Sequence, residues 1–166
     1  MAKEKATRYT IIKDTREQTG YYFSKYNLCD GMIERKLDTG DYAIDGLEDQ
    51  ICVERKSSVA ELAINLGQKK HAFLAEINRM KTFEHKYIVL EFSMADLAKF
   101  PEGTNIPQKA RSGVKITGRY MLRCLMEFEI YDDVNVIFAG DKENAFMFIS
   151  SLFKRMNEKY SIGRQK

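Results

Sequence analysis

Hydrophobic positions fall into short runs of strand length, separated by stretches with helical spacing. The segments 9–14 (YTIIKD), 51–56 (ICVERK), 86–92 (KYIVLEF) and 134–140 (VNVIFAG) are predicted strands. The runs at 86–92 and 134–140 are almost continuously apolar, as is typical of strands buried on both faces of a sheet. Residues 33–44 alternate around a Thr-Gly-Asp turn and predict a second strand or a pair of strands.

Helical patterns occupy the stretches between these strands. Ser58 and Glu61 form an S-x-x-E capping box that predicts a helix start. Further helices are predicted over 69–82 and 117–130, and a last one from Asp141, a candidate N-cap, to about residue 159. Strands that alternate with helices favour an α/β fold with a central mixed sheet flanked by helices.

The length of 166 residues suits one domain, and no repeat or linker divides the chain, so we expect a single domain spanning residues 1–166. Apolar residues are 44% and charged residues 31%, which excludes a disordered chain. No apolar run approaches the ~18 residues of a membrane span, and no signal peptide is expected. Three scattered cysteines and two histidines argue against a disulfide framework or a zinc site and predict an intracellular, cytoplasmic protein.

The net charge of +3 is mild, but its distribution is uneven. Segment 93–115 holds both prolines and polar turn signals and is predicted to be mostly loop, with basic residues concentrated from Lys99 to Arg123. Acidic residues concentrate between Asp14 and Glu61. This pattern fits either two solvated faces or basic flanks that hold a polyanion around an acidic, metal-binding centre.

The strand at 51–56 begins as a core strand and ends in three charged residues. Glu54 and Lys56 share one face, about 7 Å apart, whereas Arg55 points to the other face. The pair is either a structural ion pair or a metal ligand beside a lysine that orients water or offsets charge on a phosphate. An E-x-K triplet alone does not decide between these interpretations.

Other acids follow neighbouring strands. Asp14 and Glu17 come just after the first strand, and Asp41 follows the glycine of the Thr-Gly-Asp turn. Several carboxylates gathered at adjacent strand ends would raise one another's pKa values unless a hard divalent cation bound between them. Mg²⁺ prefers such oxygen ligands, and it can polarise a phosphate and activate water. The pattern therefore points to phosphodiester hydrolysis.

The motifs DTRE, GDYAI and CVERKS, in this order, resemble the nuclease domain of the XPF-type structure-specific endonucleases. That family's signature is GD…ERK-x-x-x-D with an upstream DxRE, and the similarity extends through the whole chain. The resemblance implies a restriction-endonuclease-like α/β core and a Mg²⁺ (or Mn²⁺) cofactor. It also implies cleavage of branched DNA such as flaps, forks or recombination junctions, in repair, recombination or replication.

The resemblance assigns roles residue by residue. It implies a catalytic set of Asp14, Glu17, Asp41, Glu54, Arg55 and Lys56. Within this set Asp14, Asp41 and Glu54 would ligate metal, Lys56 would be the catalytic lysine, and Arg55 would be a conformational or phosphate-facing partner. The family acid four residues after the lysine falls on Ala60, with Glu61 next to it.

Two further departures concern the DNA contacts. A Gly-Arg pair common in the family is replaced by Lys69-Lys70, and neither a helix-hairpin-helix module nor a helicase is recognised, as in short free-standing bacterial or viral members. Tyr21, Tyr22 and Tyr26 could stack on an unpaired base or pack in the core. The residues expected to face DNA are Arg16, Lys69, Lys70, Lys109, Arg111, Lys115 and Arg119.

Partner and activity expectations complete the hypothesis. By resemblance, the chain forms a homodimer through its C-terminal helix, where Phe146 and Met147 add apolar surface beside the core stripe. A catalytically silent relative that binds branched DNA or scaffolds a partner is the alternative, although silent members lose the ERK or GD acids that are present here. A restriction-type enzyme that reads base sequence ranks last, because no recognition domain is evident.

Overall fold

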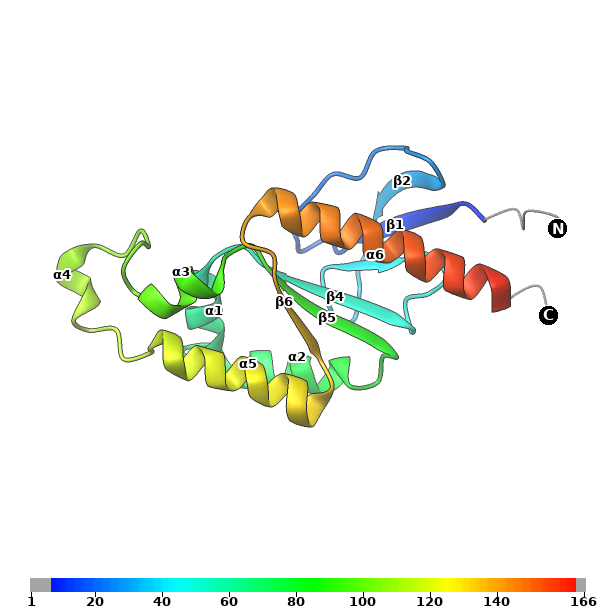
Figure 1. The fold of residues 1–166 in the computed structure, drawn as a ribbon. Coiled ribbons are helices and arrows are strands. Elements are labelled where there is room, and N and C mark those ends of the chain that lie inside the picture. The colour runs from blue at the N-terminus through cyan, green and yellow to red at the C-terminus, as the bar shows by residue number, and fades with distance from the viewer. Residues whose placement is uncertain (1–6, 164–166) are drawn as a thin grey trace.

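The computed structural model describes residues 7–163 as one six-stranded sheet with helices on both faces (Figure 1). The elements in chain order are β1 (Tyr9–Lys13), β2 (Cys29–Glu34), β3 (Tyr42–Ile44), β4 (Ile51–Lys56), α1 (Val59–Leu66), α2 (Lys70–Met80), β5 (His85–Leu90), α3 (Met94–Lys99), α4 (Gln108–Arg111), α5 (Gly118–Asp132), β6 (Asn135–Phe138) and α6 (Lys142–Gly163). No helix in this described stretch is long and apolar enough to cross a membrane.

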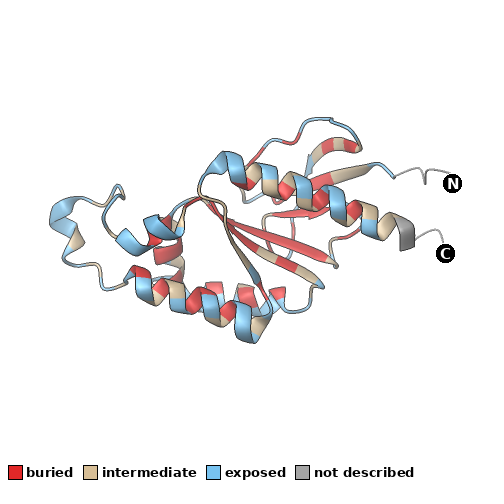
Figure 2. Cartoon of the chain, in the orientation of Figure 1, coloured by how far each residue is buried: buried red, intermediate tan, exposed pale blue. Residues whose placement is uncertain are grey.

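The sheet is mixed, with strand order β2-β1-β3-β4-β5-β6. Strand β1 pairs in parallel with β2, and β3 pairs antiparallel with both β1 and β4. Strands β4, β5 and β6 run parallel to one another, so β4 and β5 end at the same edge. All six residues of β4 are buried, because helices cover both of its faces (Figure 2).

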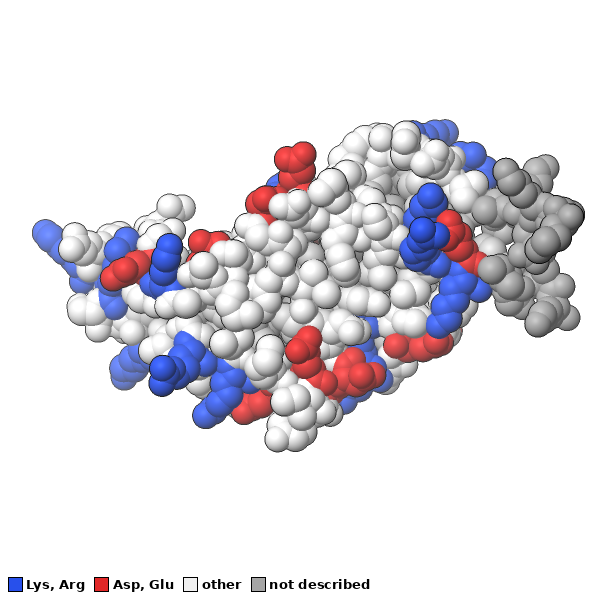
Figure 3. Space-filling view, in the orientation of Figure 1, with Lys and Arg blue, Asp and Glu red and all other residues white. Residues whose placement is uncertain are grey.

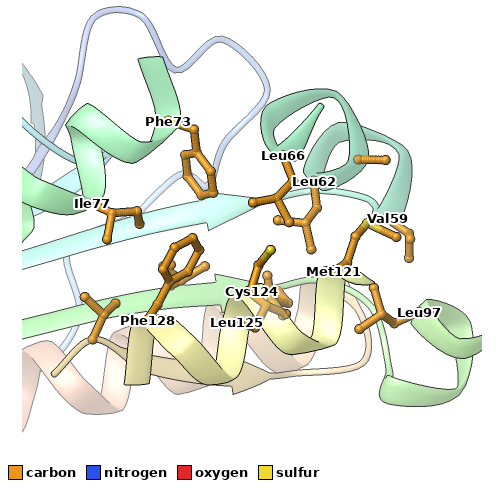
Figure 4. Close-up of a cluster of buried hydrophobic side chains, with 14 of the residues drawn as sticks. Val59, Leu62, Leu66, Phe73, Ile77, Leu97, Met121, Cys124, Leu125 and Phe128 are labelled. Atoms are coloured by element: carbon orange, nitrogen blue, oxygen red, sulfur yellow. The ribbon is translucent and has the colours of Figure 1, made fainter. Parts of the chain in front are cut away.

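Two hydrophobic clusters hold the helices against the two faces of the sheet. On one face, Cys52 of β4 and Leu90 of β5 pack with α1, α2 and α5. Leu62, Phe73 and Phe128 belong to this cluster (Figure 4). On the other face, Val53 and Val89 pack with Ile149 and other buried residues of α6. Alternation along β4 therefore sends Glu54 toward the α1–α2 side and Arg55 toward the α6 side.

The predicted fold class is confirmed, and most elements lie where the hydrophobic pattern placed them. Ser58 caps α1 by accepting a hydrogen bond from the Glu61 backbone N–H. Asp141 likewise accepts from the Asn144 backbone N–H at the start of α6, over a distance of 2.7 Å.

Three segments differ from their predictions. Strand β6 was predicted to be buried on both faces, but it lies at the edge of the sheet and none of its residues is fully buried. Residues 33–44 are not one alternating unit: β2 begins earlier, at Cys29, and β3 is only three residues long. Strand β2 lies at the edge of the sheet, and Gly31 has a positive φ of 105° beside a register shift, so alternation there is broken. Segment 93–115 contains α3, which starts at a Ser93–Asp96 capping box, and the short α4.

Candidate active site

The charged end of β4 forms a buried ion pair. Lys56 Nζ donates to Glu54 Oε1 over 2.5 Å, and the two side chains are 5% and 6% exposed. The Lys56 ammonium also lies 4.7 Å from the centre of the Phe73 ring on α2. The pair thus sits between the sheet and α2, where charges interact strongly because water is scarce.

Asp41 reaches the same place through a turn that requires glycine. Gly40 has a φ of +81°, and a Cβ at this position would lie 2.6 Å from Cys52 Sγ. The turn brings the Asp41 backbone N–H to Val53 O at 2.8 Å, and Asp41 Oδ2 accepts from the Arg55 N–H at 2.7 Å. The GD motif therefore fixes a carboxylate beside Glu54.

These acids line an open polar cavity of about 420 Å³ at the edge of the sheet where β4 ends. Its walls come from the loop after β1, the Gly40 turn, β4, α1 and α2. The lining residues are Arg16, Glu17, Gln18, Thr19, Gly40, Asp41, Glu54, Arg55, Glu61 and Glu76.

The carboxyl groups of this cavity repel one another. Burial, together with the charges of Glu17 and Glu76, raises the pKa of Asp41 to about 7. Burial and the charge of Asp41 raise the pKa of Glu54 well above its ordinary value. Although burial disfavours its charged form, the charge and hydrogen bond of Glu54 raise the pKa of Lys56. A cation between Asp41 and Glu54 would remove this repulsion.

The donor set fits a hard divalent cation. One oxygen each of Asp41 and Glu54 is used by Arg55 and Lys56, and no other hydrogen bond from the described residues reaches the second oxygens. Within residues 7–163, no three Asp, Glu, His or Cys side chains are arranged as a ready-made metal site. Two carboxylates completed by water and substrate phosphate are the usual environment of Mg²⁺.

Asp14 and Glu17, which are close in sequence, are placed differently. Asp14 is buried outside the cavity, where its carboxylate accepts from the Arg16 side chain at 2.6 Å and from the Leu37 N–H at 2.6 Å. Burial alone would raise the pKa of Asp14, but these hydrogen bonds hold it below its ordinary value. Glu17 lines the cavity, so only Glu17 joins Asp41 and Glu54.

Sequence reasoning missed two acids near the site. Glu76 of α2 lines the cavity. In the sequence it could have been noticed as an acid between Phe73 and Ile77, the buried positions of its helix. Glu91 is buried directly after β5, and in the sequence it could have been noticed as a charged residue inside the apolar run KYIVLEF.

Glu61 lines the cavity 3.9 Å from Lys56 Nζ, while its Oε2 accepts from the backbone N–H and the hydroxyl of Ser57.

The predicted DNA-facing residues divide into two groups. Lys70 Nζ donates to Tyr120 OH at 3.0 Å, and Arg123 lies over the same ring. Lys69 is the N-cap of α2 and precedes Lys70 directly. We call Lys69, Lys70 and Arg123 the α2–α5 basic patch. Arg119 lies on the α3 side of α5, beside Leu97 and Ala98, and Lys115 is exposed in the segment before α5.

The remaining basic candidates lie elsewhere. Lys109 is exposed on α4, at the end of the molecule where Lys and Arg side chains outnumber acidic ones (Figure 3). Arg111 donates to the carbonyls of Ile106 and Thr104 and so holds its own loop together. Arg16 is bound to Asp14 but also lines the cavity.

A mixed sheet with helices on both faces and an acidic cavity at the end of a central strand defines a restriction-endonuclease-like fold. The ERCC4 domain matches residues 13–152, and the chain therefore belongs to the ERCC4 domain family. Together with the XPF-like fold, this membership places it in a family of structure-specific DNA endonucleases.

Two solved structures share this fold. XPF from Aeropyrum pernix superimposes with a TM-score of 0.61 at 18% identity, and the match covers 94% of this chain and 69% of that one. XPF from the same organism in complex with DNA gives a TM-score of 0.55 at 17% identity, covering 95% and 66%. No curated protein matched the sequence.

Proposed function

We propose that the protein is a metal-dependent endonuclease that hydrolyses phosphodiester bonds in branched DNA inside the cell. The observation that carries this proposal is the convergence of Asp41 and Glu54, each with a second carboxylate oxygen available, beside the buried Lys56 in an open polar cavity. Family membership supports the same activity.

Each residue has a defined task in this proposal. Asp41 and Glu54 would hold Mg²⁺ or Mn²⁺, which when bound would supply Lewis-acid activation of the phosphate and of the attacking water. The Lys56 ammonium, kept protonated by Glu54, would offset negative charge that develops on the phosphate. The fixed turn at Gly40 and the buried ion pair place these groups before substrate arrives.

The α2–α5 basic patch and Lys109 would hold the DNA backbone. Their side chains are exposed, and Lys69 and Lys70 stand at the start of α2, which also lines the cavity through Glu76. Phosphate contacts by such residues supply affinity without reading base sequence, which suits an enzyme that recognises DNA shape. The DNA complex of the Aeropyrum pernix XPF supports DNA as the ligand.

We also propose a homodimer through α6, with a revised contact. Phe146 stacks on Phe23 with ring centres 5.1 Å apart, so it belongs to the core side of the helix. Met147 is 55% exposed and borders an apolar groove of about 450 Å³ between α6 and the segment 23–29. Met147, rather than Phe146, is therefore the residue offered to a partner chain.

Labelled flap, fork, four-way and linear duplex DNA, incubated with the protein, would test the activity. We expect cleavage of a branched substrate with Mg²⁺ or Mn²⁺ and binding without cleavage in Ca²⁺, whose larger and looser coordination shell positions water poorly. Full cleavage in EDTA would contradict the metal requirement. Binding without cleavage in every metal would favour the catalytically silent alternative.

A further inference from the structure

On the face of β4 opposite Glu54, Arg55 forms a buried pair with Glu91. Arg55 Nε donates to Glu91 Oε1 at 2.7 Å and Nη2 to Oε2 at 2.9 Å, and both side chains are at most 5% exposed. This parallel, two-bond geometry orients the guanidinium as well as neutralising it. Glu91 therefore fixes the direction of the remaining guanidinium N–H groups.

Tyr21 completes this cluster from the loop after β1. Its hydroxyl donates to Glu91 Oε1, and the Arg55 guanidinium lies 5.3 Å from the centre of its ring. The Tyr21 ring also stacks on Tyr42, with ring centres 5.5 Å apart, and the Tyr21 backbone N–H donates to the Tyr42 hydroxyl at 2.7 Å. We call Tyr21, Arg55 and Glu91 the Arg55 cluster.

The Arg55 nitrogen Nη1, which does not bind Glu91, points to loop 15–20 beside the cavity. Arg55 Nη1 donates to Glu17 Oε2 at 3.2 Å and to Thr19 Oγ1 at 3.4 Å. Lys142, at the start of α6, donates to Thr19 O at 2.9 Å. Gly20 allows the close packing, because a Cβ there would lie 1.8 Å from the Tyr42 hydroxyl.

We propose that Glu91 is a positioning residue, which acts through Arg55 to hold the loop 15–20 and thereby places Glu17 at the cavity beside Asp41. The proposal rests on the proposed function only in so far as the cavity binds a divalent metal. The Arg55 guanidinium binds two acids: it donates two hydrogen bonds to Glu91 and one longer hydrogen bond to Glu17. If Glu91 loses its charge, Arg55 is oriented less firmly, its contacts with Glu17 and Thr19 weaken, and the loop no longer fixes Glu17 beside Asp41.

Glu91→Gln tests this in two ways that need no DNA. Mn²⁺ binding, followed by electron paramagnetic resonance, should weaken by about tenfold, the scale seen when a partner of a metal-site residue is changed. Trypsin should cleave the metal-free variant faster than wild type after Arg16, because the loop is held less firmly. With DNA, the Mn²⁺ concentration for half-maximal cleavage should rise, while KM for DNA stays unchanged.

Two further variants keep the test decisive. Glu143→Gln, an exposed acid in the first turn of α6, is the matched control and should change neither readout. Tyr21→Phe removes one hydrogen bond to Glu91 and should weaken Mn²⁺ binding by about threefold and speed proteolysis. If Glu91→Gln does not fold, Tyr21→Phe decides.

A folded Glu91→Gln or Tyr21→Phe protein with wild-type Mn²⁺ affinity and wild-type proteolysis would overturn the proposal. If wild type itself binds no Mn²⁺, the proposed function fails. The proteolysis comparison then decides alone whether the Arg55 cluster holds the loop.

Discussion

Two aspartates close to neighbouring strand ends have different tasks. Asp41 faces the cavity with one oxygen available, whereas both Asp14 oxygens are occupied by Arg16 and the Leu37 N–H. The same residue type thus serves the site in one case and the fold in the other. Hydrogen-bond partners, and not proximity in sequence, decide which role each carboxylate has.

Asp41→Asn should lower the cleavage rate by at least about 10²-fold, because one preorganised charge of the metal site is removed. The DNA dissociation constant should change little, since phosphate contacts elsewhere dominate affinity. Single-turnover cleavage and a binding titration in Ca²⁺ would measure the two quantities. A near-wild-type rate in the folded variant would contradict the assignment of Asp41 as a ligand.

Asp14→Asn should instead lower the free energy of unfolding at about pH 7 by about 1–3 kcal/mol, because a buried, hydrogen-bonded carboxylate is removed. The folded state lowers the pKa of Asp14, so its contribution is present above the unfolded value and is lost as pH falls through the folded value. Urea unfolding at several pH values should show the difference between variant and wild type shrinking below about pH 5.

A pH-independent difference would contradict this account of Asp14. The variant should keep Mn²⁺ affinity within about twofold of wild type, because Asp14 does not line the cavity. Loss of Mn²⁺ binding in a folded Asp14→Asn protein would show instead that Asp14 is a metal ligand.

At the scale of elements, the sequence predicted the strand that carries the site but not everything packed around it. The apolar start and charged end of β4, and the glycine before Asp41, are visible because they break a periodic pattern. Glu76 and Glu91 were missed because their roles depend on which helix and strand lie beside β4. Edge strand β2 was misplaced because half-exposed, irregular strands carry little alternation.

The packing of α2 against α5 creates a basic surface from residues about 50 positions apart in sequence. The double variant Lys69→Ala/Lys70→Ala should weaken DNA binding and reduce the slope of log K against log salt by about one for each phosphate that the variant no longer binds. Fluorescence anisotropy at several salt concentrations would measure both effects.

The matched control is Arg155→Ala/Lys159→Ala on α6, which removes the same amount of positive charge. Lys159 pairs with Glu84 just before β5, at the end of the sheet opposite the cavity. This control should leave the salt slope unchanged. Equal slopes for the two double variants would show that net charge, and not the α2–α5 basic patch, governs binding.

For the whole molecule, the proposed dimer depends on the exposed side of α6. Met147→Glu should place a charge in the contact and give a monomer by light scattering at micromolar concentration, because an unpaired charge buried in an interface is costly. Ile130→Glu, at an exposed apolar position on α5, should leave the assembly unchanged. A wild-type protein that is monomeric with and without branched DNA would refute the dimer.

The last helix holds the first loop, and this has a consequence for synthesis. Lys142 bonds to Thr19, Phe146 stacks on Phe23, and Asn157 Nδ2 donates to Thr7 O at 2.5 Å. A growing chain therefore carries Asp41, Glu54 and Lys56 long before it can fix the loop that bears Glu17. The contacts from α6 to this loop form only after α6 has left the ribosome, so the proposed activity would be complete only in a nearly finished chain.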